Sequence, residues 1–425
     1  MLAREACPFD PWNPQSAIEQ ILDCIGDRRL VLLGEATHGT SEFYRFRAGL
    51  TATLIQRRGF RIVALEADWP DARRLDDFVR HRQPAGDWTA FARFPTWMWR
   101  NREMLDFCRW LRVRNLAHPI ERRAGLYGLD LYSLSSSIAA VLQYLNGVDP
   151  ELARRAAERY ACFSPFLEDP ASYGEHATLG GFQGCEREAL DMLGDLLRRQ
   201  LQSAGEDQDR FLDAAQNARL VANAEAYYRS IYYGDADSWN LRDSHMFETL
   251  TTLLEWQGGS SKAVVWAHNS HLGDARATQM ARRGEHNIGQ LCRERFGEEC
   301  FLLGFGTDRG TVAAATDWGG PMEIKQVRPA RGDSYEGLCR RLGIPAFHLP
   351  LLEASTELRE GLEAPRLERA IGVIYRPESE RYSHYFEARL PSQFDHYVWF
   401  DETAAVDPLP TAPESGPADT FPFGV

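Results

Sequence analysis

The chain has 425 residues, of which 61 are acidic Asp or Glu and 48 are basic Lys or Arg, giving a formal net charge of −13. This acid excess argues against a nucleic-acid binder, because such a protein needs a basic surface that neutralises phosphates. With 44 % hydrophobic residues, a chain of this length can bury a large core, either as two domains or as one large domain with an insertion.

The cysteines and the apolar segments indicate a compartment. None of the eight cysteines forms a C-x-x-C pair, and the chain is too long and cysteine-poor for a disulfide scaffold, so we expect reduced thiols. The N-terminus lacks the basic and apolar regions of a signal peptide. No apolar stretch approaches the ~20 residues that cross a bilayer. We therefore expect a cytoplasmic protein with no membrane partner and no nucleic-acid partner.

The first third of the chain alternates between predicted helices and strands. Residues 17–27 carry apolar side chains on one helical face, and 29–34 are an apolar run of strand length. Residues 41–58 are again helical, and 60–65 form a second strand that leads into a helix beginning at Trp69. This order predicts parallel strands joined by right-handed crossovers.

The middle of the chain changes character. After a weaker strand at 123–129, nearly every segment from about 133 to 255 has helical periodicity, whereas strand patterns return afterwards. The strands expected there are 262–267, 299–306, 311–316, 370–375 and 397–401. The prediction is an α/β fold, with a central, mostly parallel sheet flanked by helices, a helical insertion or cap lobe, and a cleft between them. Its parts are a discontinuous α/β domain at 1–132 and 257–407, a helical insertion at 133–256 and a Pro-rich tail at 408–425, which we expect to be disordered or draped over the surface.

Three of the predicted strands end in ionisable side chains. In open α/β sheets, ligands bind at the carboxyl ends of the strands, so neighbouring strands would bring these groups into one cleft. The alternative is that the side chains cap the following helices and bridge loops. The groups are, in chain order, Glu35 and His38, Glu66 and Asp68, and His268 and His271.

Within this cluster, His38 is the candidate general base. It comes just before a helix, whose positive N-terminal dipole disfavours the imidazolium and keeps the ring able to accept a proton. Glu35 or Glu66 could orient the other ring nitrogen. Arg47, two turns into the same helix, could bind an anionic substrate group or a developing oxyanion. The alternative for Arg47 is a surface salt bridge.

Residues 239–243 (WNLRD) interrupt the predicted helices just before a helix at 244–256. Asp243 could cap that helix, and Arg242 could extend across the mouth of the cleft as a second positive group. The aromatic residues offer a substrate wall, although core packing is the alternative for most of them. The candidates for this wall are Trp97, Trp99, Tyr233 and Trp239.

Several familiar signatures are absent from the sequence. There is no G-x-S-x-G nucleophile elbow, no H-E-x-x-H zinc helix and no G-x-x-x-x-G-K-[ST] phosphate loop. We therefore expect no cofactor and no metal. A metal-dependent hydrolase remains an alternative, because His38, Glu66, His268 and His271 include enough nitrogen and oxygen ligands for a divalent ion. A second alternative is a non-enzymatic protein that binds a hydrophobic or haem-like ligand.

Taken in order and spacing, these motifs resemble the erythromycin esterase family over roughly residues 15–407. The matching stretches are GEATHGT at 34–40, EADWP at 66–70, WMWRN at 97–101, NLRD at 240–243, HNSH at 268–271, IGVIYRP at 371–377 and SHYF at 383–386.

The resemblance implies an α/β fold with a helical lobe and a deep cleft, and hydrolysis of an ester, of which macrolide lactone opening is the activity linked to antibiotic resistance. It implies that His38 activates water without a covalent serine intermediate, supported by Glu35 and Glu66. It also implies roles for a further set of basic residues, which are Arg47, Arg242, His268 and His271. The expected partner is a small-molecule ester or lactone, and no motif specifies an oligomeric state.

In the resulting hypothesis, His38 takes a proton from a water held between its ring and Glu66, and the hydroxide attacks the ester carbonyl. Arg242, or a protonated His268 or His271, stabilises the oxyanion and later protonates the leaving alkoxide.

Overall fold

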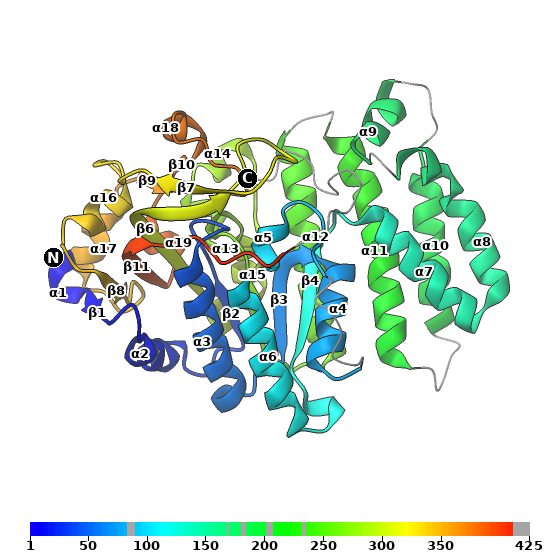
Figure 1. The fold of residues 1–425 in the computed structure, drawn as a ribbon, viewed down its shortest axis with the longest axis horizontal. Helices are drawn as coiled ribbons and strands as arrows, with labels where there is room; N and C mark the ends of the chain where they lie inside the picture. Colours follow the sequence, from blue (N-terminus) through cyan, green and yellow to red (C-terminus); the bar gives the residue numbers. More distant parts are fainter. Residues whose placement is uncertain (83–89, 168–169, 180–183, 201–206, 232–234, 411–425) are drawn as a thin grey trace.

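The computed structural model of the chain describes residues 1–82, 90–167, 170–179, 184–200, 207–231 and 235–410. Its centre is a nine-stranded sheet in the order β1-β8-β11-β6-β2-β5-β3-β4, with β7 paired to β6 (Figure 1). The five pairs from β11 to β4 are parallel, and the pairs that involve β1, β8 and β7 are antiparallel. The predicted mostly parallel sheet is confirmed. A separate two-stranded sheet pairs β9 with β10.

The strands and helices have the following bounds. The strands are β1 Cys7–Pro8, β2 Leu30–Leu33, β3 Ile62–Asp68, β4 Gly125–Asp130, β5 Ala263–Trp266, β6 Cys300–Ala314, β7 Glu323–Val327, β8 Ala346–Leu349, β9 Arg366–Arg369, β10 Tyr385–Ala388 and β11 His396–Thr403. The helices are α1 Leu2–Glu5, α2 Gln15–Ile25, α3 Ser41–Arg58, α4 Trp69–Val79, α5 Thr96–Trp99, α6 Arg102–Leu116, α7 Leu134–Val148, α8 Pro150–Tyr160, α9 Pro170–Leu179, α10 Glu186–Gln200, α11 Gln208–Ser230, α12 Asp235–Trp256, α13 Asn269–Leu272, α14 Met280–Arg283, α15 Ile288–Phe296, α16 Tyr335–Arg340, α17 Thr356–Leu362, α18 Glu380–Ser383 and α19 Leu390–Gln393.

Both faces of the sheet are covered, which explains why its central strands are apolar throughout. Leu30 and Leu32 of β2 pack into one core cluster, which extends into α7, α11, α12 and α15. Val31 and Leu33 pack into a second cluster with α2, α3 and α6 on the opposite face. Because side chains alternate along a strand, a strand buried on both faces has no polar positions.

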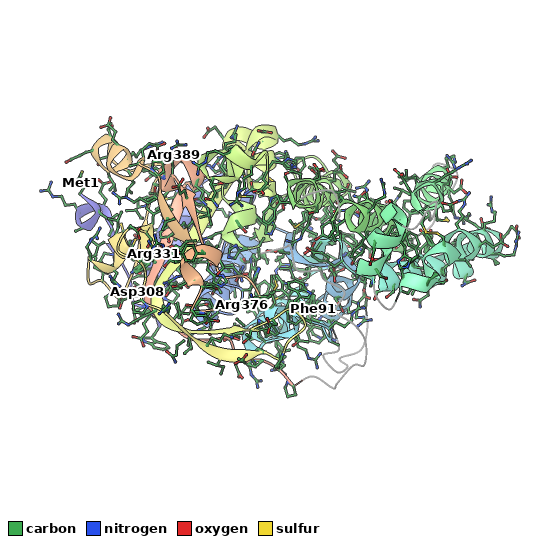
Figure 2. The ribbon with its side chains drawn as sticks, turned by 90° about the horizontal axis from the view of Figure 1, so that it is seen from above. Met1, Phe91, Asp308, Arg331, Arg376 and Arg389 are labelled. Atoms are coloured by element: carbon green, nitrogen blue, oxygen red, sulfur yellow. A yellow bond between two sulfur atoms is a disulfide. The ribbon has the colours of Figure 1, made fainter. Side chains whose placement is uncertain are left out.

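The helical region between β4 and β5 extends to one side of the sheet, as two perpendicular views show (Figures 1 and 2). In the described part of this region, the regular elements are the helices α7 to α12 and the short 3-10 helix η2 Ala161–Phe166. The helical lobe expected from the periodicity is present; its status as a separate domain stays a prediction. The helix α12 runs along the border and contacts both β4 and β3.

The predicted break at 239–243 is wrong. The helix α12 is continuous from Asp235 to Trp256, so Asp243 lies inside it and does not cap its start. The polar side chains at 239–243 suggested a break in the helix. In the structure they form hydrogen bonds to residues distant in sequence and do not cap the local backbone. Asp243, for example, accepts the backbone N–H of Ile288 at 2.9 Å.

Two strand predictions in the last third need correction. The segments 299–306 and 311–316 belong largely to one strand, the 15-residue β6. The segment 370–375 is not a strand: Ile371 forms an isolated bridge with Thr37, and Ile374 forms another with Ala315. Its run of buried side chains resembles a strand pattern, but it crosses two separate segments and pairs with each at a single residue.

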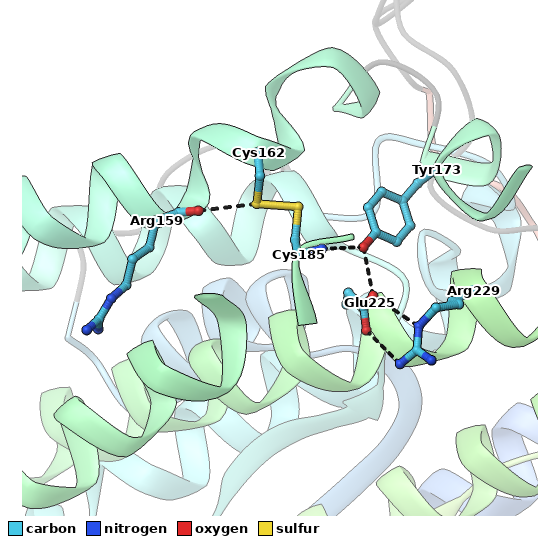
Figure 3. The surroundings of a disulfide bond; sticks show 6 residues. All are labelled: Arg159, Cys162, Tyr173, Cys185, Glu225 and Arg229. Atoms are coloured by element: carbon cyan, nitrogen blue, oxygen red, sulfur yellow. Dashed lines mark hydrogen bonds and ion pairs between the residues drawn. A yellow bond between two sulfur atoms is a disulfide. The ribbon is translucent and has the colours of Figure 1, made fainter. Parts of the chain in front are cut away.

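The prediction of reduced cysteines is wrong for one pair. Cys162 and Cys185 form a disulfide in the helical region, with their Cα atoms 6.0 Å apart (Figure 3). Cys185 directly precedes α10, and its backbone N–H donates to the Tyr173 hydroxyl at 2.7 Å. That hydroxyl donates to Glu225 of α11 at 2.7 Å. The remaining six cysteines are free thiols.

Two sequence expectations concern the surface. Among the described residues, no helix is both long enough and apolar enough to cross a membrane. The first residues of the Pro-rich tail pack on the surface: Pro408 bridges to Asn101, and Leu409 donates its N–H to the Arg100 carbonyl at 3.0 Å. Residues 411–425 of the tail lie outside the described residues.

A buried histidine pair on β8 and β11 makes the fold sensitive to acid. Nδ1 of His348 lies 2.9 Å from Nε2 of His396. Burial lowers the pKa of His348 from 6.5 to about 4, and it lowers the pKa of His396 well below its usual value. Both rings are therefore neutral in the folded protein at pH values where the unfolded chain protonates them.

Stability should therefore be complete above about pH 6.5 and should fall as the pH drops towards 4. His348 alone contributes a loss of about 2 kcal/mol between pH 7 and pH 5. Urea unfolding at both pH values measures this loss. A His348→Gln variant should lose less free energy than the parent over the same interval; an equal loss would contradict the assignment.

Candidate active site

The ends of four neighbouring strands form the candidate site. In the sheet order β2-β5-β3-β4, the loop 34–40 follows β2, the loop from His268 follows β5, Glu66 lies near the end of β3, and Asp130 ends β4. The strands are parallel, so these ends meet at one edge. The expectation that the three charged strand ends are neighbours is confirmed. Asp130 is a fourth member of the cluster that the sequence hypothesis did not include.

The loop after β2 holds His38 in a tightly packed backbone. Its carbonyl at Glu35 accepts the Asn269 N–H at 2.8 Å, and the His38 N–H donates to the Ile371 carbonyl at 3.3 Å. Two glycines are required by close approach. A Cβ at Gly34 would lie 2.2 Å from Oδ1 of Asn269, and a Cβ at Gly39 would lie 2.0 Å from a backbone oxygen.

A buried chain of charges orients the His38 ring. Nδ1 of His38 lies 2.9 Å from Oε1 of Glu35, and Oε2 of Glu35 accepts from Nη2 of Arg47 at 2.6 Å. The guanidinium of Arg47 lies over the rings of Tyr44 and Trp266, at 4.5 and 4.9 Å. Arg47 is therefore a buried partner of Glu35, neither a surface salt bridge nor positioned to touch a substrate.

The carboxylate of Glu66 lies at the centre of the site. Its Oε1 accepts from Nη2 of Arg242 at 2.8 Å and lies 3.3 Å from Nε2 of His271. Its Oε2 accepts the backbone N–H of His268 at 2.8 Å. Burial alone would raise the pKa of Glu66, but the neighbouring His271, His38 and Arg242 hold it well below its usual value. Glu66 is therefore an ionised acceptor.

Arg242 crosses from the helical region to the sheet. It donates to both carboxylate oxygens of Asp130, from Nε at 3.0 Å and from Nη2 at 2.7 Å. Its guanidinium lies 5.1 Å from the ring centre of Tyr132. One sequence signal points to Asp130: it directly follows the weak strand predicted at 123–129.

His271 is held as an imidazolium. Its Nδ1 lies 2.9 Å from Oδ2 of Asp243, and its ring stacks on Trp239 at 4.6 Å and 6°. Burial lowers its pKa, but Asp243 and Glu66 outweigh this effect and raise it to about 9. Its Nε2 lies 3.3 Å from Oε1 of Glu66. Nη1 of Arg242 lies 3.0 Å from the same nitrogen. The carboxylates of Glu66 and Asp130 hold this guanidinium in place.

His268 has the opposite charge state. Burial, together with the neighbouring His38, lowers its pKa to about 3. Its Nδ1 accepts the backbone N–H of Ser270 at 3.2 Å and lies 2.8 Å from Oγ of the same residue. A protonated His268 that stabilises an oxyanion, as the sequence hypothesis allowed, is therefore inconsistent with this environment.

A cavity of about 80 Å³ opens above these groups, and four of the predicted site residues line it: His38, Glu66, Trp99 and Arg242. The other predicted catalytic residues contact lining residues without lining the cavity themselves. The complete lining is His38, Glu66, Ala67, Asp68, Asp71, Phe91, Arg93, Phe94, Pro95, Met98, Trp99, Asp130, Tyr132, Arg242, Trp318 and Val373.

The predicted aromatic wall is mostly elsewhere. Trp97 is buried against Phe94, with ring centres 5.3 Å apart, and does not line the cavity. Trp239 lines a second hollow of about 290 Å³, on the other side of His271. Tyr233 lies outside the described residues. Among the described members of the predicted wall, Trp99 alone faces the cavity, and its indole N–H donates to the Glu66 carbonyl at 2.9 Å.

The metal-dependent alternative requires three or more suitable ligands around one point. Within the part of the chain that the structure describes, no three His, Cys, Asp or Glu side chains are arranged to hold a metal ion. Three of the four ligands proposed for such an ion have other partners, whereas Nε2 of His268 has no hydrogen-bond partner among the described residues. Glu66 bonds to Arg242, for example, and Nδ1 of His38 lies against Glu35.

The fold and the cluster of histidines, carboxylates and arginines at the strand ends define an α/β protein with a candidate catalytic site at one edge of its sheet. Comparison with known proteins identifies its group. The family model for erythromycin esterase matches residues 55–403. The chain therefore belongs to the erythromycin esterase family, which is a family of hydrolases.

Individual relatives are distant. The chain is 20 % identical to "Putative hydrolase YbfO" of Bacillus subtilis (strain 168), over 94 % of this chain and 90 % of that protein. A solved Bacillus cereus protein has a TM-score of 0.81 at 21 % identity, covering 96 % of this chain and 98 % of that one.

Two further solved structures share the fold. A succinoglycan biosynthesis protein has a TM-score of 0.77 at 20 % identity, covering 96 % of each chain. A histidine-to-asparagine mutant of the erythromycin esterase EreC, in its open conformation, has a TM-score of 0.68 at 18 % identity, covering 96 % of this chain and 99 % of that one. The predicted fold and family resemblance are confirmed.

The buried pair of Glu35 and Arg47 gives a first prediction for this site. An Arg47→Leu variant leaves Glu35 as an uncompensated buried charge, so the free energy of unfolding should fall by about 3–5 kcal/mol. Arg45, on the exposed face of the same helix, lies 5.8 Å from the Trp12 ring and provides the matched control. Arg45→Leu should cost less than about 1 kcal/mol. Equal losses in urea unfolding would contradict the buried pair.

The charge of His271 gives a second prediction. An Asp243→Asn variant keeps an oxygen that can accept the Ile288 N–H, but it removes the negative charge that lies beside Nδ1 of His271. The pKa of His271 should then fall from about 9. Titration of the ring by NMR measures this change. Asp274→Asn, which alters a carboxylate paired with Arg276 at 2.6 Å, is the control and should leave His271 unchanged. A parental titration in the Asp243 variant would refute the pairing.

Proposed function

We propose that the protein hydrolyses a carboxylic ester with water activated by His38. The observation that carries the proposal is the fixed orientation of this ring. Glu35, itself held by Arg47, accepts a hydrogen bond from Nδ1–H, which leaves Nε2 as the basic nitrogen. His38 lines the cavity, and Nε2 lies 3.9 Å from Oε1 of Glu66. A water bound between these two atoms would face a substrate in the cavity.

The reaction then follows from the neighbouring groups. Nε2 of His38 takes a proton from the water as its oxygen bonds to the ester carbonyl carbon, giving a tetrahedral oxyanion. Arg242 is the cation that lines the cavity beside Glu66, and it is the candidate for stabilising that oxyanion. Collapse of the intermediate breaks the carbon–oxygen bond to the alcohol. The leaving alkoxide takes the proton from the His38 imidazolium, so an acid and an alcohol are released.

The size of the cavity favours a small ester group. Pockets for drug-sized ligands commonly have volumes of about 300–1,000 Å³, whereas this cavity measures about 80 Å³. It holds a compact acyl or alcohol group. A macrolactone or a haem-like ligand would require the cavity to widen, so we propose simple esters and small lactones ahead of macrolides.

The assignment of His38 as the general base predicts a loss of catalytic rate when its ring is removed. A His38→Ala variant should lose about 10²–10⁴-fold in kcat/KM while keeping its fold, because general base catalysis contributes that factor. Mass spectrometry with a panel of acyl esters, small lactones and macrolides measures the reaction. A lactone gains the mass of one water on hydrolysis.

His176 provides the matched control. It is an exposed histidine in α9, whose Nδ1 lies 2.9 Å from the Ser172 carbonyl. His176→Ala should keep the parental rate, and circular dichroism should show that both variants are folded. Parental turnover by a folded His38→Ala protein would overturn the assignment of the base.

A further inference from the structure

A buried carboxyl group with no cation partner adjoins the candidate active site. Glu368, in β9, is 0 % exposed, and the mechanism proposed for His38 does not use it. Its Oε1 accepts a hydrogen bond from Nδ2 of Asn269 at 3.1 Å, whereas its Oε2 has no hydrogen-bond partner among the described residues. Nor does any described Lys, Arg or His side chain form an ion pair with this carboxyl group. Arg369, its neighbour in β9, pairs instead with Glu380 at 3.1 Å.

The surroundings of Glu368 disfavour a negative charge. Three buried polar side chains from other elements lie near it: Glu336 of α16, Gln393 of α19 and Tyr397 of β11. Burial, assisted by the charge of Glu336, raises the pKa of Glu368 from 4.5 to about 8. Burial also raises the pKa values of Glu336 and Tyr397, although Arg369 opposes the shift of Glu336. Glu368 is therefore protonated near pH 7 and ionises in mildly alkaline solution.

Asn269 connects Glu368 to the loop that carries His38. Its backbone N–H donates to the Glu35 carbonyl at 2.8 Å. Its side chain is fixed at both ends: Oδ1 accepts the Phe305 N–H at 3.3 Å, and Nδ2 donates to the Phe305 carbonyl at 2.7 Å and to Glu368. A movement of the Asn269 side chain is therefore transmitted through its backbone to the loop.

A second connection runs along the chain from β9. Ile371 lies three residues after Glu368. Its N–H donates to the Ala36 carbonyl at 2.9 Å, and its carbonyl accepts the His38 N–H at 3.3 Å. The loop is thus held from two sides, by Asn269 and by Ile371. Glu368 adjoins both of these segments, so a change in its charge can reach the loop by either connection.

Ionisation of Glu368 disturbs this support. A buried carboxylate without a cation is stable only if water or other donors replace its lost hydration, so the side chains around it must move apart. The side chain in contact with its Oε1 is that of Asn269. The competing explanation is that Glu368 only fills space beside the sheet. In that case its charge has no effect on the loop.

We propose that Glu368 is a positioning residue for the candidate active site, which acts through Asn269 to hold the loop that carries His38, and that a negative charge on Glu368 releases this hold. The inference rests on the proposed ester hydrolysis and adds a regulation by pH to the same site. In the neutral acid, the carbonyl oxygen accepts from Asn269, and the loop keeps the His38 ring in position. In the ionised form, the ring loses its fixed orientation, so proton transfer from water slows.

The pH dependence of kcat tests the proposal. With an acyl ester that the parent protein hydrolyses, kcat should fall at least about tenfold between pH 7 and pH 9, because the neutral fraction of a group with a pKa of about 8 falls by that factor. Glu368→Gln keeps an oxygen that can accept from Asn269, but it cannot ionise. Its kcat should fall no more than about threefold, which the titration of His271, with a pKa of about 9, accounts for. KM should change little, because the lost interaction is made in the transition state.

Glu387 provides the matched control. It is an exposed acid of β10, the strand paired with β9, and its carboxylate pairs with Arg282 at 2.5 Å. Glu387→Gln should keep the parental pH profile. An equal fall of kcat in the parent and in Glu368→Gln would overturn the proposal and leave ester hydrolysis standing. A parent whose kcat does not fall by pH 9 would overturn it as well.

Hydrogen exchange separates the positioning role from the reaction itself. The N–H groups of His38 and Ile371 form two of the bonds that hold the loop, so peptides that cover 34–40 and 370–375 report on it. After correction for the intrinsic effect of pH, exchange in the parent should be about tenfold faster at pH 9 than at pH 7, and it should not change in Glu368→Gln. If exchange responds in this way but no ester is hydrolysed, the proposed reaction fails and the positioning role stands. Exchange that is independent of pH in the parent, or that rises equally in the variant, refutes the positioning role.

Discussion

The carboxylate of Glu66 is the interaction on which the rest of the site depends. It accepts from Arg242 of the helical region, from the backbone of His268 after β5, and it lies 3.3 Å from His271. A buried carboxylate is stable only when cations and hydrogen bonds replace its lost hydration. Glu66 therefore joins the helical region to the sheet at the point where the cavity forms. The position of Arg242, and with it the cavity wall, follows from this pairing.

Around this centre, each buried cation has its own carboxylate. Arg47 pairs with Glu35, Arg242 is shared between Glu66 and Asp130, and His271 lies against Asp243. His38 lies between the first two pairs, 2.9 Å from Glu35 and 3.9 Å from Glu66. Glu35 contacts Nδ1 of the ring, and Nε2 is the nitrogen on the side of Glu66 and the cavity. This arrangement supports the proposed role of His38 as a general base.

How far the sequence predicts this site depends on the range of the interactions. The apolar runs identify β2, β3 and β5, and the parallel order places Glu35, Glu66 and His268 at one edge, because both follow from local pattern. The continuity of α12 and the partner of Asp243 do not follow, since a carboxylate that looks like a helix cap bonds instead to His271, which is distant in sequence. The strand predicted at 370–375 is wrong for the same reason, because this segment forms only isolated bridges to Thr37 and Ala315. Tertiary contacts override a local pattern that is correct in isolation.

The Trp239 ring helps the buried His271 ring to carry a positive charge. It stacks on His271 at 4.6 Å and separates that imidazolium from the second hollow, which Trp239 and Ser270 line. Its indole N–H donates to the His286 carbonyl at 2.8 Å, which fixes the ring in place. An aromatic face stabilises a cation without adding a second negative charge. His271 thus stays protonated away from water, and Glu66 keeps a cation on the side that does not face the cavity. Trp239, which the sequence suggested as part of a substrate wall, instead covers the His271 ring on the side of the second hollow.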